Sequence, residues 1–254
     1  MHRWIPNGSS YITMPTMGNL LGRKIRLVIE RFSFDNTKTT NCYIFSQLGS
    51  TPGTREFALF FNNVDSDVEV FYGGQQNVML ANSREIFFNN ATGSVEDVLF
   101  DFEIDTATGD WRQLIDGVQT SFGTVVLTGT GRIDGMLARI GARGTSDDPD
   151  ATGGTFLMSD DSFRIGDMQI YIDDVLVRHL VMPGGTASVI PDSVSANDAV
   201  LRSGAFDGSD WNSFLDTDSV LVPVVVEVAD IVVLDRYVAP RLGHVHAQRL
   251  TEIS

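Results

Sequence analysis

The chain has 254 residues, of which 43% are hydrophobic and 20% charged, a composition that suits a folded protein with a substantial core. Acidic residues exceed Lys and Arg by enough to give a net charge of −15, which repels phosphate backbones and disfavours a nucleic-acid partner. The single cysteine, Cys42, excludes an intrachain disulfide, and we expect it to be a small buried side chain in a strand.

The N-terminal segment MHRWIPNGSSYITM lacks the continuous apolar stretch of a secretory signal. The most apolar run, residues 219–234, is interrupted by Pro223, Glu227 and Asp230 and is too short to cross a bilayer comfortably as a helix. We therefore expect no leader and no membrane insertion.

In the first half of the chain, period-two alternation of apolar residues recurs and helical periodicity is scarce. Residues 1–22 form a polar, Gly-containing lead-in that is expected to be an extended arm. Residues 24–34 predict a strand whose apolar phase slips between Ile29 and Phe32, as at a β-bulge. Further strands are predicted over residues 40–48, 56–61, 67–72 and 84–88, with a reversal at Gly73-Gly74.

The clearest strand covers residues 95–105, where Phe100, Phe102 and Ile104 share one face and acidic residues lie mostly on the other. After a reversal at residues 106–110, Asp116-Gly117 between apolar neighbours predicts a tight hairpin, because a type I′ turn needs positive φ twice.

In the second half, strands are predicted over residues 123–127, 136–140, 163–172 and 175–181, with a hairpin turn at Asp173-Asp174. Residues 144–162 and 183–219 are irregular. Residues 220–228 are apolar on both faces, as in a strand between two packed layers. The pattern predicts an all-β, two-sheet antiparallel sandwich over residues 23–236, after an N-terminal arm (1–22) and before a C-terminal segment (237–254).

Residues 23–182 carry the segments KIRLVIERFSF, EFALFF, FEIDTATGDWRQLIDG and FRIGDMQIYIDDVLVRHLVMPGG. In these, the chain resembles the concanavalin A-like superfamily, and its laminin-G-like jelly rolls in particular. The following segment, residues 192–214, is similar to those that follow laminin-G-like domains in phage-encoded proteins. The resemblance implies a jelly roll, and for some members sugar or calcium binding.

Catalysis is not expected. Glycoside hydrolases of the superfamily carry acids that alternate along one strand, and Glu103-Ile104-Asp105 begins such a pattern. Ala107 and Thr108 stand where a further Glu would be. His244 and His246 could supply two metal ligands, but no third is evident.

Two binding sites are candidates. Calcium needs six to eight hard oxygen ligands, and the long acidic loop offers five carboxylates: Asp147, Asp148, Asp150, Asp160 and Asp161. The alternative is a solvated acidic loop. Trp211 lies in a polar segment and could stack on a sugar, or it could anchor that segment to the sandwich, whereas Trp111 is expected to be buried.

These observations lead to the expectation of a non-enzymatic structural or adhesion protein of a virion, such as a capsid decoration or tail-associated protein of a bacteriophage. Its expected partners are other virion proteins, further copies of itself in a homo-oligomer, and a host-surface glycan, and it would be assembled in the host cytoplasm. The alternative is a carbohydrate-binding, lectin-like module or a relative of polysaccharide-active glucanases and lyases.

Overall fold

The computed structural model describes residues 3–4, 10–37, 42–62, 67–149, 152–155, 163–183, 188–203, 211–212, 222–228 and 231–237. The chain divides into two compact units. Residues 2–213 contain both large sheets, and residues 214–254 contain a separate strand pair. No helix in the described part of the chain is long and apolar enough to cross a membrane.

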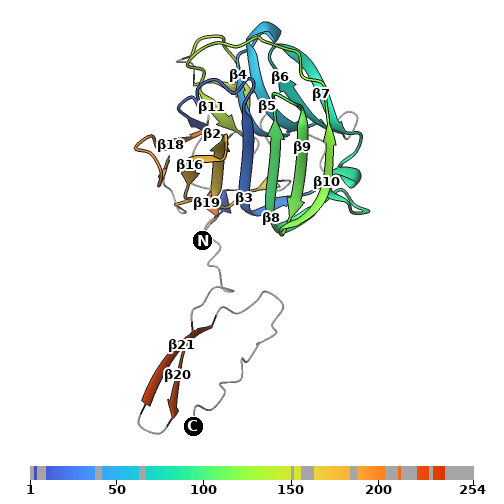
Figure 1. The fold of residues 1–254 in the computed structure, drawn as a ribbon. Coiled ribbons are helices and arrows are strands. Elements are labelled where there is room, and N and C mark those ends of the chain that lie inside the picture. The colour runs from blue at the N-terminus through green and yellow to red at the C-terminus, as the bar shows by residue number, and fades with distance from the viewer. Residues whose placement is uncertain are drawn as a thin grey trace. The chain divides into compact units, whose positions relative to one another are not determined.

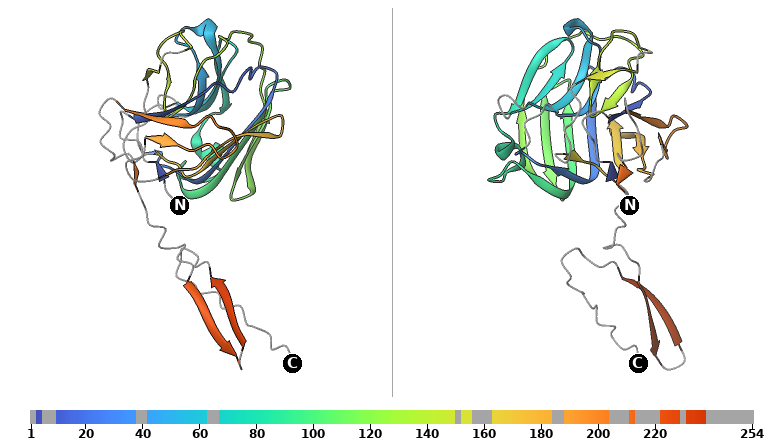
Figure 2. Two further views of the ribbon diagram at one scale, coloured as in Figure 1. Left: turned by 90° about the vertical axis from the view of Figure 1, so that its left-hand side faces the viewer. Right: turned by 180° about the vertical axis from the view of Figure 1, so that it is seen from behind.

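Two antiparallel sheets face each other in the first unit (Figures 1 and 2). The eight-stranded sheet has the order β17 (Val189–Ile190), β18 (Ala199–Ser203), β2 (Ser10–Met14), β11 (Ala138–Ile140), β4 (Cys42–Leu48), β5 (Arg55–Phe61), β6 (Val68–Tyr72), β7 (Gln75–Ala81). The seven-stranded sheet has the order β10 (Val118–Thr124), β9 (Asp110–Ile115), β8 (Val95–Asp105), β3 (Lys24–Phe34), β15 (Met168–Ile172), β16 (Val175–Leu180), and β14 (Phe163–Arg164) also pairs with β3. The fold is the expected two-sheet antiparallel jelly roll.

Shorter elements complete the described chain. Three strand pairs lie outside the large sheets: β1 (Arg3–Trp4) with β19 (Trp211–Asn212), β12 (Arg143–Gly144) with β13 (Gly154–Thr155), and β20 (Val222–Val228) with β21 (Ile231–Tyr237). A 3-10 turn, η1, spans Pro52–Thr54, and a one-turn helix, α1, spans Arg84–Phe88.

The core lies between the sheets and follows the predicted alternation. Ile25, Leu27 and Ile29 of β3 are all 0% exposed, and so are Phe100 and Phe102 of β8. Cys42 and Trp111 are buried as expected. The predicted bulge is also present, because the β3–β8 register shifts between Ile29 and Phe32.

Both predicted hairpin turns have the backbone that their sequences indicate. Asp116 and Gly117 have φ values of 51° and 78°, and Asp173 and Asp174 have φ values of 51° and 66°. Positive φ at both central residues is what a type I′ turn requires. The acidic pair at 173–174 is therefore a turn, as expected.

The predicted strand at residues 84–88 is wrong, because this segment is helix α1. Ser83 caps it by accepting a hydrogen bond from the backbone N–H of Ile86, and Asn89 ends it in the left-handed conformation. Arg84, Phe87 and Phe88 are buried together because positions i, i+3 and i+4 share a helix face. The helix contacts β7 and β10, which are the edge strands of the two sheets.

The ends of the sandwich also differ from expectation. Strand β2 lies within the predicted arm, between β18 and β11, and β18 lies within a segment expected to be irregular. The predicted strand at 123–127 is displaced to β10, which ends at Thr124. Among the described residues, strand β20 pairs with β21 alone, in the second unit.

Candidate functional site

The outward face of the seven-stranded sheet carries the charged side chains that alternate with its core residues. Strand register places Arg26 of β3 beside Glu103 of β8, and Glu103 beside Arg112 of β9. On the other side, Arg26 is paired with Tyr171 of β15, and its guanidinium lies 5.5 Å from the centre of the tyrosine ring. This face is therefore a row of alternating charges with one aromatic ring.

Two carboxylates on this face are held in ion pairs. Arg26 donates to both oxygens of Asp101, from Nε at 2.8 Å and from Nη2 at 2.6 Å. Glu103 lies between two cations, with Arg112 Nε at 3.1 Å and Lys24 Nζ at 3.4 Å. The hydrogen bonds that Arg26 donates to Asp101 raise the pKa of Arg26, so the guanidinium stays charged.

The last acid of β8, Asp105, serves the turn that follows the strand. Its Oδ1 accepts hydrogen bonds from the backbone N–H groups of Ala107, at 2.9 Å, and Thr108, at 3.4 Å. Glycoside hydrolysis needs one carboxyl that stays protonated and a second that faces the sugar. Glu103 instead contacts two cations, and Asp105 accepts the hydrogen bonds of a turn; the absence of a catalytic pair here stays a prediction.

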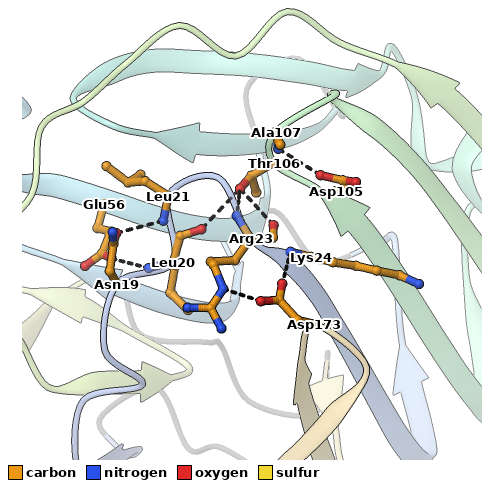
Figure 3. A network of polar contacts seen from close by, with 10 residues as sticks. All are labelled: Asn19, Leu20, Leu21, Arg23, Lys24, Glu56, Asp105, Thr106, Ala107 and Asp173. Atoms are coloured by element: carbon orange, nitrogen blue, oxygen red, sulfur yellow. Dashed lines mark hydrogen bonds and ion pairs between the residues drawn. The ribbon is translucent and has the colours of Figure 1, made fainter.

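Polar contacts connect the start of β3 with the β15–β16 turn and with the turn after β8 (Figure 3). Asp173, in the β15–β16 turn, accepts from Arg23 and from the backbone N–H of Lys24. Thr106 accepts from the backbone N–H of Arg23 at 2.9 Å. Burial raises the pKa of Glu56, but this carboxyl is 1% exposed and accepts from the backbone N–H of Leu20. Glu56 is thus a structural group beyond the reach of a substrate.

The predicted calcium loop is described in part. Asp147 Oδ1 accepts four hydrogen bonds from the turn at residues 50–54: from Ser50 N at 2.7 Å and Oγ at 3.1 Å, from Thr51 N at 3.1 Å, and from Thr54 Oγ1 at 2.7 Å. The described residues contain no group of three or more His, Cys, Asp or Glu placed to hold a metal. Asp148 takes no part in these four bonds. Asp150, Asp160 and Asp161 lie outside the described residues. Calcium binding therefore stays a prediction.

Through these bonds Asp147 connects two loops, and its contribution to the stability of the fold depends on pH. The Thr54 hydroxyl first, and then the backbone N–H groups of Thr51 and Ser50, hold the pKa of Asp147 well below its ordinary value. A lowered pKa contributes stability that is fully present above the unfolded value, near pH ~4, and is lost as pH falls toward the folded value.

Replacement D147N is therefore expected to lower the free energy of unfolding by about 1–2 kcal/mol at neutral pH. The difference from wild type should shrink when urea unfolding is repeated near pH ~3. E96Q, which changes an exposed carboxylate of β8, is the control and should have little effect. A D147N deficit that stayed constant with pH would show that Asp147 does not act through its charge.

The remaining predicted groups are placed as follows. Trp211 belongs to a strand, not a loop, since β19 pairs it with Trp4 of β1; its glycan role stays a prediction. The Nδ1 atom of His179 lies 2.8 Å from Ser193 Oγ. His2, His244 and His246 lie outside the described residues.

A surface hollow that the sequence did not indicate lies between α1 and β10. We call it the α1–β10 hollow; its volume is about 570 Å³. Its lining includes Glu85, Ile86, Asn89 and Asn90 from the helix and its cap, and Thr120 and Phe122 from β10. Phe122 is 72% exposed and Ile86 55% exposed, so an aromatic and an aliphatic side chain face solvent in one depression.

The hollow was missed for two reasons. The helix that forms one wall was predicted to be a strand, although Ser83 three residues before Ile86 is an N-cap signal. In the sequence, Phe122 cannot be distinguished from a buried apolar residue of a strand. Only the β9–β10 register, which places it opposite Arg112 on the outward face, shows that it is exposed.

No protein-family model matches the chain, and no curated protein matches its sequence. Solved structures with similar folds include a candidate carbohydrate-binding protein from Bacteroides ovatus (13% identity, TM-score 0.47, 80% of this chain and 58% of that one). They also include domains LG4-5 of the mouse laminin α1 chain (10% identity, TM-score 0.44, 82% of this chain and 47% of that one). A third is the NanB sialidase of Streptococcus pneumoniae (13% identity, TM-score 0.44, 70% of this chain and 26% of that one).

The chain thus spans between about a quarter and three-fifths of the length of these proteins. The similarity is one of fold, and it covers between 70% and 82% of this chain. The fold of this chain is itself read from its two antiparallel sheets.

Proposed function

We propose that this chain is a non-enzymatic structural and adhesion protein of a viral particle, of the capsid-decoration or tail-associated kind found in bacteriophages. It acts through protein–protein contacts and glycan binding. The observation that carries the non-enzymatic part is the pairing on the outward face, where Asp101 and Glu103 are bound to Arg26, Arg112 and Lys24. Carboxylates held in this way are poor general acids, because a general acid must first carry a proton, and the protonated form would leave the neighbouring cation unpaired.

The contact part of the proposal is supported by exposed apolar side chains near one edge. Val118 and Phe122 of β10 are 67% and 72% exposed, and Val126, just beyond the strand, is 74% exposed. Strand β10 is also the edge of its sheet, with one side of its backbone free of sheet partners among the described strands. Exposed apolar groups along the edge of a sheet are typical of surfaces that bind another protein chain or a ligand.

Assembly is supported by the second unit. In the described chain, the strands of β20 (VPVVVEV) and β21 (IVVLDRY) pair only with each other. A two-stranded hairpin is marginally stable alone in water, and an apolar one gains most by packing against another surface. A neighbouring subunit is the partner that we propose, and the particle context comes from the phage-like resemblance of residues 192–214.

A lectin-like module that works outside a particle is the second candidate function. The specific observation that favours it is the α1–β10 hollow, where exposed Phe122 lies with amide and hydroxyl side chains. This candidate shares the binding chemistry and differs in having no need to assemble.

Size-exclusion chromatography with light scattering on the full chain separates the two candidates. The particle protein is expected to elute as a stable trimer or larger ring, because virion components form closed symmetric assemblies. A monomer that retains sugars would support the lectin, and a monomer that binds no glycan would contradict both. Repeating the run with a chelator tests the calcium prediction, since calcium-dependent assembly would change the elution.

A further inference from the structure

The α1–β10 hollow combines three kinds of surface within one depression. Phe122 provides an aromatic ring that is 72% exposed. Asn89, exposed at the helix cap, provides an amide with both a donor and an acceptor. Thr120 provides a hydroxyl that is fixed in place by donating to Gln113 Oε1 at 2.8 Å. An exposed aromatic ring with an amide and a hydroxyl in the same lining matches a ligand with one C–H face and hydroxyls at its rim.

The walls of the hollow are held by hydrogen bonds within the protein. Asn90 Oδ1 accepts from the backbone N–H of Thr92 at 3.1 Å and of Gly93 at 2.7 Å, and Asn90 Nδ2 donates to Ser94 O at 2.9 Å. Glu85 Oε1 accepts from Asn36 Nδ2 at 3.0 Å. A site fixed in this way loses little entropy when a ligand binds.

The charge of the lining restricts the ligand further. Glu85 is the only ionisable residue among those that line the hollow. A hydrogen bond from its own backbone N–H, with one from Ser83, lowers the pKa of Glu85, so it is ionised at neutral pH. With a net charge of −15 on the chain, the hollow repels anions. Uronic and sialic acids are therefore disfavoured relative to neutral sugars.

We propose that the α1–β10 hollow binds a neutral pyranose sugar, with its C–H face on Phe122 and its hydroxyls toward Asn89 and Thr120. This inference rests on the proposed glycan-binding function and names the site and the ligand class. The sandwich core lies on the other side of α1, where Phe87 is 0% exposed, so the hollow can be altered without disturbing the core.

The test uses the full chain and saturation-transfer NMR with methyl glycosides of glucose, galactose, mannose and N-acetylglucosamine. Glucuronic acid and N-acetylneuraminic acid are the anionic counterparts. A shallow site for one sugar ring should have a Kd of about 1 mM, so sugars are titrated to about 20 mM. At least one neutral sugar is expected to bind, and both acids to bind at least about tenfold more weakly.

Three variants locate the site. F122A should weaken binding about tenfold by removing the stacking surface. N89G should weaken it about fivefold, while glycine keeps the left-handed cap that Asn89 now forms, with φ 53°. V126A is the matched control, since Val126 is as exposed as Phe122 and does not line the hollow. Its affinity should equal that of wild type.

Two results would overturn the inference and leave the proposed function standing. Sugar binding that is equal in F122A and wild type would place the glycan site elsewhere. An F122A variant that loses its oligomeric state, with no neutral sugar bound by wild type, would make the hollow a protein contact. A monomeric wild type that binds no sugar would overturn both the inference and the proposed function.

Discussion

Replacement of Phe87 by alanine is expected to lower the free energy of unfolding by about 3–5 kcal/mol. Phe87 is 0% exposed and lies where α1 closes the space between the edges of the two sheets. Its ring centre lies 5.9 Å from that of Phe61 in the eight-stranded sheet and 5.9 Å from that of Trp111 in the seven-stranded sheet. Alanine would leave a cavity that both sheets border and neither can fill.

Urea unfolding followed by circular dichroism measures this loss. I86A is the matched control, because Ile86 is the preceding residue of the same helix and is 55% exposed. It should cost about 0.5 kcal/mol. If both variants lost similar stability, α1 would not stabilise the fold by filling the space between the two sheet edges. Its position beside β10 would then need another explanation.

Replacement of Gly109 by alanine is expected to cost about 3 kcal/mol or more, far beyond the same change at Gly117. The two glycines flank strand β9, in the turns before and after it, with φ values of 81° and 78°. A Cβ at Gly109 would lie 1.8 Å from the carbonyl oxygen of Val125, whereas a Cβ at Gly117 meets nothing within 4 Å. Both alanines are strained by positive φ, and only one also collides with backbone.

G117A should therefore cost about 1 kcal/mol from strain alone, and the difference between the variants reports the collision. Comparison of their midpoints of urea unfolding, with the m-value unchanged, makes the measurement. Equal costs would mean that the segment after β10 does not run against the β8–β9 turn. That contact also includes a hydrogen bond from Val125 N to Gly109 O at 3.0 Å.

The central strands could be predicted because their local chemistry agrees with their environment. Strands β3 and β8 bury one face each, so the alternation of Ile25, Leu27, Phe100 and Phe102 is visible in the sequence. The Asp116-Gly117 turn needs no partner beyond its own residues. In each case a short stretch of sequence contains the whole signal.

Strands that depend on distant partners could not be predicted in this way. In β2, the adjacent residues Ile12, Thr13 and Met14 are all at most 3% exposed, so burial on both faces removes the alternation. The partner strand β18 places Val200 opposite Thr13, although the two residues lie at opposite ends of the first unit's sequence. Helix α1 has a single turn, too short for a helical period to appear.

The candidate site shows the same limit. The acidic sequence around Asp147 predicts a calcium ligand, which stays a prediction, and it contains no sign that the four hydrogen-bond donors of Asp147 come from residues 50–54. No local pattern contains that contact. The exposure of Phe122 likewise depends on register with β9 and on the position of α1, which are properties of the folded chain.

We propose that this jelly roll binds sugars without changing them. The most direct test is a titration of the isotopically labelled full chain with a neutral oligosaccharide chosen by the saturation-transfer screen. Signals of Phe122 and Asn89 and the anomeric protons of the sugar are followed in the same tube. We expect shifts at α1, at β10 and at Arg112 beside Phe122, with the anomeric signals unchanged over days. Shifts centred on Glu103 and Arg26, with new reducing-end signals, would contradict this expectation, because they would show an active site at the centre of the outward face.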